Sequence, residues 1–268
     1  LAPITGVPFR TGRESCYEFQ ESIEPEKQDS YTMGLSCMFQ VEERREESEF
    51  IPPDWAEKIE KNQLTHRMPD LKSPMENFWY LELGGTRDCI GDAEQIGDEL
   101  LPLAYGMWDY LKNGVGEKEK HKNWALSWIG ALPGKRESRR YEGPYIMNQN
   151  DVESGGDFED EIAYGGWSMD DHNPAGFRTQ EEPTIYHPAP SPYGIPFRCL
   201  YSKGVPNLLF AGRNISVSHA ALSSCRVMGT CALLGQAAGT AASLAITEQC
   251  FPKDFSKEQI VRLQHILM

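Results

Sequence analysis

Hydrophobic and polar positions alternate most clearly in the first half of the chain. The run from Tyr31 to Val41, YTMGLSCMFQV, is rich in strand-forming residues, and NFWYLEL, from Asn77 to Leu83, predicts a second strand. The stretch EERREESE at 42–49 is charged enough to predict a solvated turn or loop. These patterns indicate a region of mixed strands in the first part of the chain.

A helical period follows the second predicted strand. Asp92 can cap the start of this helix, and Asn113 with Gly114 predicts its end. Pro102 lies inside the pattern and removes a helix hydrogen bond, so a kink or a break is expected there. The apolar positions at helical spacing are Ile96, Leu100, Leu103 and Trp108.

The C-terminal third changes pattern three times. NLLFAG at 207–212 predicts a buried parallel strand that ends at a sheet edge, where ligands bind in open α/β folds. Residues 213–227 are polar and poor in helical period, so a loop is expected. From Gly229 to Ile246, thirteen of eighteen residues are Gly, Ala, Ser, Thr or Cys, which predicts a thin helix with Gly235 and Gly239 on one face.

Thinness in a helix is useful where a sheet or a cofactor must approach the backbone closely. A tightly packed core helix is the plain alternative for Gly229 to Ile246. A membrane dimerisation helix is weaker, because polar residues interrupt a span that is already short.

Two regions are predicted along the chain. Residues 1–122 are expected to form a substrate or cap region with mixed strands and the long helix, with a seam at the polar stretch EKEKHKN. Residues 123–268 are expected to hold a loop-rich segment followed by the C-terminal strand, loop and helix. Residues 151–196 are rich in Gly, Pro, Asp and Tyr, which predicts ordered functional loops.

Composition narrows the classes of function. Of 268 residues, 40% are hydrophobic and 25% are charged, which is ordinary for a folded, soluble protein. The formal net charge of −14 disfavours nucleic acid and anionic membranes as partners. Seven widely spaced cysteines without a C-x-x-C pair are expected to be mostly buried thiols in a reducing, cytoplasmic setting, with a disulfide framework as the alternative.

The start of the thin helix is suited to binding an anion. Its unpaired N–H groups near 228–231 and the positive end of its dipole would stabilise negative charge. A reduced flavin carries such charge at the pyrimidine end of its ring. The strand, loop and helix are therefore predicted to close over a flavin.

The same stretches carry a family resemblance. The order NLLFAGRNIS…SHAALSSCRVMGTCALLGQAAGTAA resembles the C-terminal signature of the FAD-dependent oxidoreductase family whose flavin fold is that of the glutathione reductase class. Upstream, GKRESRRYEGPYIMNQNDV, DDHNPAG and YGIPFRCLYSKGVPNLLFAGR resemble that family in order and spacing, and GVPFRTGRESCYEFQES is similar to the segment after its central flavin-contacting strand. The resemblance implies an α/β fold, FAD as cofactor and hydride transfer from an organic substrate.

The chain departs from the family at one motif. No Gly-x-Gly-x-x-Gly turn, which would hold the FAD pyrophosphate, is present in the sequence. We therefore expect the C-terminal portion of a longer flavoenzyme, consistent with a first residue that is Leu1, with a partial FAD-binding domain. Such a piece is expected neither to hold FAD nor to act by itself.

The resemblance also assigns roles to residues. Those predicted to bind the cofactor are Gly212, Arg213, Asn214 and Ser216, toward the ribityl or pyrophosphate region, and Met228, Gly229 and Thr230, at the pyrimidine end of the ring. His219 is the candidate acid or base, because imidazole titrates near neutrality; a hydrogen-bonded packing histidine is the alternative. Arg226 could fix a substrate carboxylate or a flavin carbonyl.

A basic cluster and a second histidine complete the candidate site. The segment KRESRR brings Arg136, Arg139 and Arg140 together in an acidic chain, which favours an anionic substrate or cofactor phosphate over a solvated turn. His172 is expected to line the substrate cleft. Asp170 and Asp171 lack a third ligand at metal-binding spacing, so no metal is predicted.

A non-catalytic carbohydrate-binding or assembly module remains open as a second class of function. It would need Trp79, Trp124, Trp128 and Trp167 exposed on one face. The expected partner of the enzyme is a small organic molecule. The 208–211 strand would lie at a sheet edge, so a homo-oligomer is a further possibility.

Overall fold

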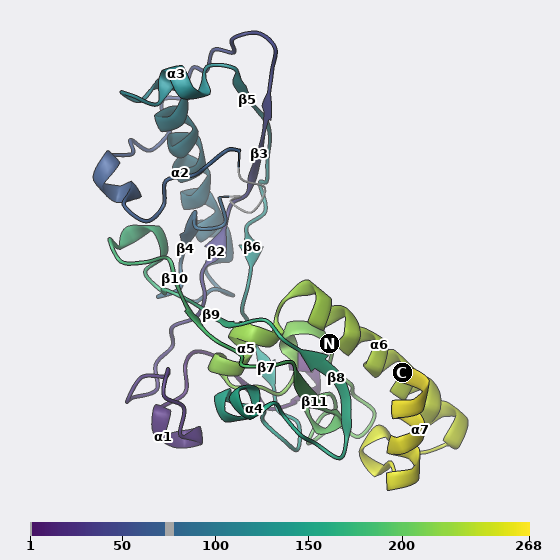
Figure 1. Ribbon diagram of the computed structural model, residues 1–268. Helices are drawn as coiled ribbons and strands as arrows, with labels where there is room; N and C mark the ends of the chain where they lie inside the picture. Colours follow the sequence, from purple (N-terminus) through teal and green to yellow (C-terminus); the bar gives the residue numbers. More distant parts are fainter. Residues whose placement is uncertain (1, 73–77) are drawn as a thin grey trace. The chain divides into compact units, whose positions relative to one another are not determined.

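The computed structural model describes residues 2–72 and 78–268 (Figure 1). The chain divides into two compact units. The first unit contains Leu1–Ser30, Ser138–Asp171 and Tyr186–Met268, and the second contains Tyr31–Glu137 and His172–Ile185. The boundary predicted between residues 122 and 123 falls inside the second unit, and the roles assigned to 1–122 and 123–268 stay a prediction.

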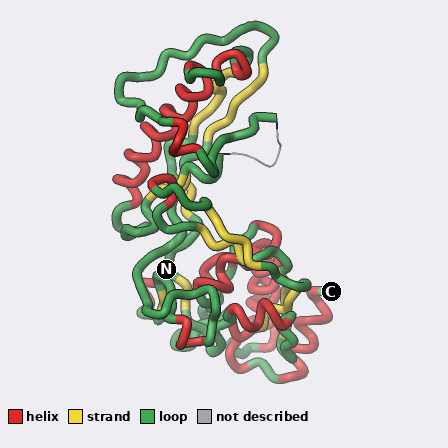
Figure 2. Tube along the Cα trace, turned by 60° about the vertical axis from the view of Figure 1, so that its left-hand side comes forward, coloured by secondary structure: helices red, strands yellow, loops and turns green. Residues whose placement is uncertain are grey.

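Two small antiparallel sheets and one long helix build the second unit. β2 is the central strand of the three-stranded sheet, and β3 pairs with β5, the two lying side by side (Figure 2). The elements are β2 (Leu35–Ser36), β3 (Phe39–Glu43), η2 (Lys61–Leu64), β4 (Glu82–Leu83), α2 (Ala93–Asn113), α3 (Lys118–His121), β5 (Trp124–Ile129), β6 (Gly134–Lys135) and η3 (Gly176–Arg178).

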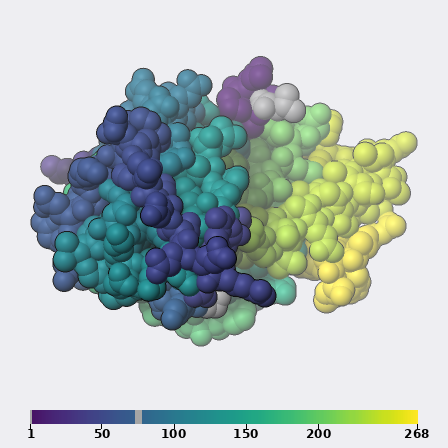
Figure 3. All heavy atoms as spheres, turned by 90° about the horizontal axis from the view of Figure 1, so that it is seen from above, coloured from purple at the N-terminus to yellow at the C-terminus, as the bar shows by residue number. Residues whose placement is uncertain are grey.

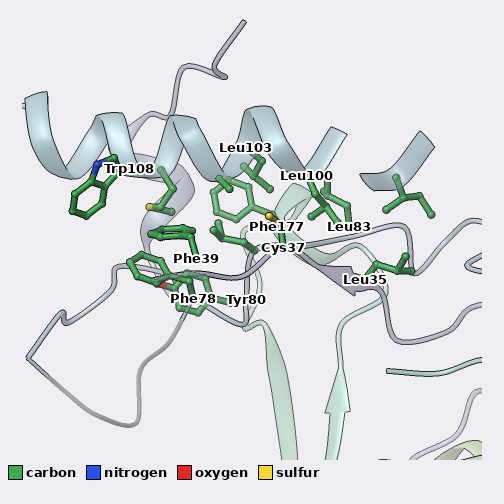
Figure 4. Packing of buried hydrophobic residues seen from close by; sticks show 14 of the residues in the cluster. Leu35, Cys37, Phe39, Phe78, Tyr80, Leu83, Leu100, Leu103, Trp108 and Phe177 are labelled. Carbon is green, nitrogen blue, oxygen red and sulfur yellow. The ribbon is translucent and has the colours of Figure 1, made fainter. Parts of the chain in front are cut away.

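Helix α2 confirms the helical period read from the sequence. Asp92 stands at its N-cap and Gly114 at its C-cap. The four predicted apolar positions are buried, and Figure 4 shows Leu100, Leu103 and Trp108 directed toward Phe39, Phe78 and Phe177. The helix runs unbroken through Pro102, whose carbonyl oxygen accepts a hydrogen bond from the Glu57 N–H.

Lys112 is a buried cation near the end of α2. Its ammonium group donates hydrogen bonds to the backbone carbonyls of His121, Lys122 and Trp124 at 2.9, 2.9 and 2.7 Å. Burial lowers the pKa of this group. Three charge-assisted bonds offset that burial and tie the helix end to α3 and the start of β5.

Both predicted strands of this unit are wrong in part. Tyr31–Val41 contains β2 and the start of β3, separated by Cys37 and Met38. In the stretch predicted from Asn77 to Leu83, β4 covers the last two residues, and Asn77 lies outside the described residues. Phe78 has φ +57° and its carbonyl accepts from the Leu81 N–H, so this stretch turns. The aromatic side chains of this stretch are present because they pack in the core, and the backbone that carries them is not a strand.

Short antiparallel pairs and three longer helices form the first unit. β1 pairs with β7, and β8 pairs with β11. β9 (Met169–His172) and β10 (Thr184–His187) pair with each other where the chain leaves and re-enters this unit. The remaining elements are η1 (Ala2–Thr5), β1 (Phe9–Arg10), α1 (Cys16–Phe19), β7 (Arg140–Tyr141), α4 (Gln149–Ser154), β8 (Glu161–Gly165), β11 (Tyr193–Pro196), η4 (Phe197–Cys199), η5 (Gly212–Asn214), α5 (His219–Cys225), α6 (Met228–Glu248), η6 (Pro252–Asp254) and α7 (Lys257–Leu267).

Residues 151–196 are therefore more regular than predicted, because they contribute β8, β9, β10 and β11. The β8–β11 pair packs against α6, and the yellow C-terminal segment with α7 lies against the yellow-green α6 in Figure 3. Each of these strands is short and packs against neighbouring segments. Its residues are therefore too few to give a recognisable alternation of apolar and polar positions in the sequence.

Helix α6 confirms the predicted thin helix. Its buried face carries Leu234 and Leu244 among alanines. A Cβ atom added at Gly229, Gly235 or Gly239 would meet no described atom within 4 Å. Among the described residues α6 is the one helix long and apolar enough to cross a membrane by length and composition, a test that core helices also pass.

Two predictions next to α6 are wrong. Residues 208–211 form no strand; Leu209 makes one isolated antiparallel bridge to Tyr201, and the flanking bonds to Leu200 and Ser202 do not extend it into a ladder. Residues 213–227 are not a continuous loop, since they contain α5, which is buried along its whole length. Its serines suggested solvent exposure, yet Ser223 and Ser224 bond internally to the carbonyls of Ala220 and Trp167.

The cysteines agree with the predicted buried thiols. All seven lie in the described part of the chain and none forms a disulfide. Cys37, Cys89, Cys199 and Cys225 are buried, and the other three are partly buried.

Candidate functional site

Helix α5 places the two predicted catalytic residues at its two ends. His219 is its first residue and Arg226 its C-cap. In Figure 1, β9 passes beside α5. Consecutive residues of β9 hold both side chains: the Arg226 Nη2 donates to Asp170 Oδ2 at 3.1 Å, and His219 Nε2 lies 3.3 Å from Asp171 Oδ1. The acidic pair that the sequence left without a role therefore positions both candidate residues.

Carboxylates from the N-terminal segment surround the start of α5. The His219 backbone N–H donates to Glu14 Oε2 at 2.9 Å, and the N-cap Ser218 donates through Oγ to Glu21 Oε1 at 2.6 Å. Negative charge at a helix N-terminus is favourable, because the free N–H groups and the dipole point at it. These bonds tie α5 to a segment about 200 residues earlier in the chain.

The carboxylates of Glu14, Glu21 and Glu24 differ in the number of hydrogen bonds that they accept. Glu14 also pairs with the Arg140 guanidinium at 2.9 Å. Burial raises the pKa of Glu21, and its bonds from Ser218 and Gln149 partly offset that rise. Glu24 is 8% exposed, and neither of its carboxylate oxygens has a hydrogen-bond partner among the described residues. Burial raises the pKa of Glu24 to about 7, with the charge of His219 acting against the rise.

Imidazole and carboxylates in this arrangement can exchange protons. His219 is 2% exposed, whereas the side chain of its partner Asp171 is 21% exposed. Asp171 is thus the more accessible member of the His219–Asp171 pair. An imidazole held by a carboxylate is a side chain suited to general acid–base chemistry.

The predicted substrate residues do not form one described cluster. Arg139 and Arg140 lie in the first unit, and Arg136 and His172 lie in the second. Arg140 is buried, with Nη2 donating to the Gly12 carbonyl at 2.6 Å and to Glu14. The Arg139 guanidinium stacks over the Phe9 ring at 5.1 Å.

Arg136 and His172 meet on a buried carboxylate of the second unit. His172 Nδ1 lies 2.7 Å from Glu82 Oε2, and Arg136 Nη1 lies 3.3 Å from the same oxygen. Burial acts to raise the pKa of Glu82, but Arg136 and His172 outweigh it and the pKa is lowered. The ring of His172 also contacts Trp79, with centroids 5.0 Å apart. The substrate-binding role of Arg136 and His172 stays a prediction. In the structure both side chains pair with Glu82.

The predicted cofactor residues come together at one place. η5, which contains Gly212, Arg213 and Asn214, packs against α6, whose first residues are Met228, Gly229 and Thr230. Gly212 has φ +69°, a conformation that favours glycine. Asn214 donates to the Arg139 carbonyl at 2.7 Å, while Ser216 and Thr230 are buried beneath the surface.

The start of α6 is open and lacks a side-chain cap. Val227 stands at the N-cap and provides no side-chain acceptor. Met228 is 90% exposed, and a Cβ at Gly229 would meet nothing within 4 Å. The buried Arg213 Nη1 has no hydrogen-bond partner among the described residues. Unpaired N–H groups, a helix dipole and an unpaired guanidinium nitrogen all favour an anion here.

The sequence matches one protein-family model over almost its whole length. The model described as FAD dependent oxidoreductase matches residues 1–267 of the chain. The chain belongs to this family. The search of curated proteins and the search of solved structures each found no match.

FAD is therefore the cofactor of the family, and an oxidoreductase is the class of enzyme. The residues at η5 and the start of α6 fit its anionic groups, since the orphaned Arg213 nitrogen and the uncapped helix need a negative partner. In the described residues no group of three or more His, Cys, Asp or Glu side chains could hold a metal ion, and the expectation of no metal stays untested.

The family match also bears on the binding-module alternative, which it does not support. Trp128 and Trp167 are about half exposed, and they belong to different units; Trp79 and Trp124 are partly buried. The tryptophans therefore do not define one described face.

Sequence reasoning missed the carboxylates that surround His219. Glu14, Glu21 and Glu24 occur in RESCYEFQESIE, where acidic residues normally predict a solvated surface. The spacing of seven and three residues gave no periodic signal. Glu14 and Glu21 are buried through bonds from Arg140 of β7 and from the start of α5, which no local pattern reports.

Proposed function

We propose that the protein supplies the phosphate-side loop, the helix start and the proton-accepting residues of an FAD-dependent oxidoreductase of the glutathione reductase class. It would oxidise a small organic substrate by removing a hydride. The observation that supports this is the packing of η5 against an uncapped α6, beside the unpartnered Arg213 Nη1.

Bound FAD would supply the two-electron acceptor. Arg213 would neutralise a phosphate, and the N–H groups of Met228 and Gly229 would face the electron-rich end of the flavin ring. His219 would take the proton that the substrate O–H or N–H loses as its neighbouring C–H gives up a hydride. Arg226, held by Asp170, would orient a substrate carboxylate or a flavin carbonyl.

The absence of a Gly-x-Gly-x-x-Gly turn leaves the pyrophosphate without its usual backbone cradle. We propose that a segment outside these 268 residues supplies this turn and that the 268-residue chain is inactive by itself. The substrate would be a small polar organic molecule, because the candidate site is built from charged side chains.

The test is flavin retention by two purified proteins: this chain and a version extended at its N-terminus. Each is mixed with FAD, freed of excess, and its visible absorbance recorded. A flavin spectrum in the extended protein alone supports the proposal. Retention by neither overturns the cofactor assignment, and retention by the 268-residue chain overturns the need for a further segment.

A single substitution tests the phosphate contact. Arg213→Gln in the flavin-retaining protein should weaken FAD binding at least about tenfold, because a charge-assisted hydrogen bond is lost. The control is Arg262→Gln on α7, whose guanidinium is exposed and pairs with Glu248. Equal affinities for the Arg213 variant and the unaltered protein would remove Arg213 from the site.

A further inference from the structure

The buried carboxyl group of Glu24 has no structural partner to explain it. Glu14 and Glu21 lie equally deep, but each accepts at least two hydrogen bonds. Neither oxygen of Glu24 has one among the described residues. A buried carboxylate without partners is costly, so the group is held in its neutral form over part of the physiological range.

Charged groups from the N-terminal segment, β9 and α5 act on Glu24. The charges that act on its carboxyl are those of His219, Glu21, Glu14 and Asp171, and the Arg13 guanidinium also senses it. Three of these are acidic and oppose its ionisation. Arg13 is paired with Asp29 through two nitrogens, at 2.5 Å for the closer contact.

His219 is therefore the cation near Glu24 whose own charge can change. Arg13, the other cation that senses Glu24, stays protonated at all working pH values and is paired with Asp29. An imidazole gains its charge near neutrality, where Glu24 also titrates. A positive charge gained by His219 lowers the pKa of Glu24, and a negative charge gained by Glu24 raises the pKa of His219.

We propose that Glu24 is a positioning residue that sets the proton occupancy of His219, the two side chains behaving as one coupled acid–base pair. This inference rests on the proposed function, in which His219 receives the substrate proton. While Glu24 is neutral, His219 is favoured in its neutral form, which can act as a base. Once His219 is protonated, the imidazolium charge favours loss of the Glu24 proton.

The proton count of such a cycle is balanced. The substrate O–H or N–H bond breaks and its proton binds the His219 imidazole; the Glu24 O–H bond then breaks and releases a proton to water. Each turnover passes one proton outward and leaves the pair with one. The pair returns to its starting state when the proton on His219 passes to Glu24, a transfer that leaves the number of protons in the pair unchanged.

The test is a reciprocal titration of the flavin-free chain by NMR. The chain has six histidines, and His219→Gln identifies the imidazole signal of His219 by its loss. In Glu24→Gln, the titration midpoint of His219 should fall by about one pH unit or more, because an opposite charge that acts on the imidazole is removed. Glu26→Gln, an exposed carboxylate two residues away, should leave it unchanged.

The converse measurement follows the side-chain carboxyl carbon of Glu24 in the unaltered chain and in His219→Gln. Thermodynamic reciprocity requires the Glu24 midpoint to rise by the same amount as the His219 midpoint falls. A purely structural role for Glu24 would give no such equality. Unshifted midpoints in both variants would overturn the proposal, and the titration of Glu24 in the unaltered chain would do so alone if it lay near the ordinary carboxyl value.

These outcomes are independent of flavin binding, since no flavin is present. Reciprocal shifts in the chain, with FAD retained by neither the chain nor its extended version, would sink the proposed function and keep the coupled pair. A flavin-retaining protein with unshifted midpoints would do the reverse.

Discussion

The stability of the first unit should depend on pH through the buried carboxyl group of Glu24. Burial raises the pKa of Glu24 to about 7, whereas the unfolded chain holds it at the ordinary value of 4.5. Between these values the folded state binds the proton and the unfolded state does not. Stability that is fully present below pH 4.5 is therefore lost as pH rises through 7.

The size of this loss follows from the shift. A displacement of about 2.5 pH units corresponds to about 3 kcal/mol, at 1.36 kcal/mol per unit. Between about pH 5 and about pH 8 the expected change is about 2.5 kcal/mol, since part of the loss lies below pH 5. Glu24→Gln keeps the shape of the side chain and removes the ionisation, so this part of the pH dependence should vanish.

Urea unfolding followed by circular dichroism at several pH values measures this difference. Any cost of burying the glutamine amide is the same at every pH, so the quantity to compare is the change in unfolding free energy between two pH values. Relative to the unaltered chain, Glu24→Gln should gain about 2.5 kcal/mol between about pH 5 and about pH 8. Glu26→Gln is the matched control for the change in net charge. Parallel curves for all three proteins would show that Glu24 ionises freely in the folded chain.

Four further substitutions should change the free energy of urea unfolding in defined directions. Gly106→Ala in α2 should cost about 2 kcal/mol, because its Cβ would overlap the Glu57 carbonyl oxygen, whereas Gly239→Ala in α6 should gain up to about 1 kcal/mol in open space; equal signs would contradict the packing of these helices. Lys112→Met should cost about 3 kcal/mol by leaving three carbonyls without a donor, and unchanged stability would mean that water replaces the ammonium. Ser218→Ala should cost about 2 kcal/mol through loss of the N-cap and of a bond to a buried carboxylate, and a cost below about 0.5 kcal/mol would refute both contacts.

Long helices could be predicted from the sequence because each carries its own period and its own ends. α2 begins after Asp92 and ends before Gly114 as expected, and α6 follows the run of small residues. In both cases the signal is local. Short strands gave no such signal, since a two-residue strand such as β4 exists only because β2 lies beside it.

The sequence pointed to the candidate residues around Gly212, His219 and Gly229. It did not point to the carboxylates that bond to α5. The order of residues around Gly212, His219 and Gly229 pointed to flavin chemistry, and the family match agrees with it. The polar composition of α5 hid a buried helix, because its serines bond to the backbone inside the protein. The acidic N-terminal segment hid its own burial, which depends on residues about 200 positions away.

The division of the first unit into three distant segments has a consequence for its synthesis. Glu14 can accept its hydrogen bond only after His219 has left the ribosome, a separation of 205 residues. Until then, the acidic segment lacks the His219 N–H and the Ser218 hydroxyl that it bonds in the folded protein. Loop closure over such a distance is slow compared with the local formation of α2. The second unit, most of which lies in the continuous stretch Tyr31–Glu137, can fold during translation, while the residues around His219 assemble last.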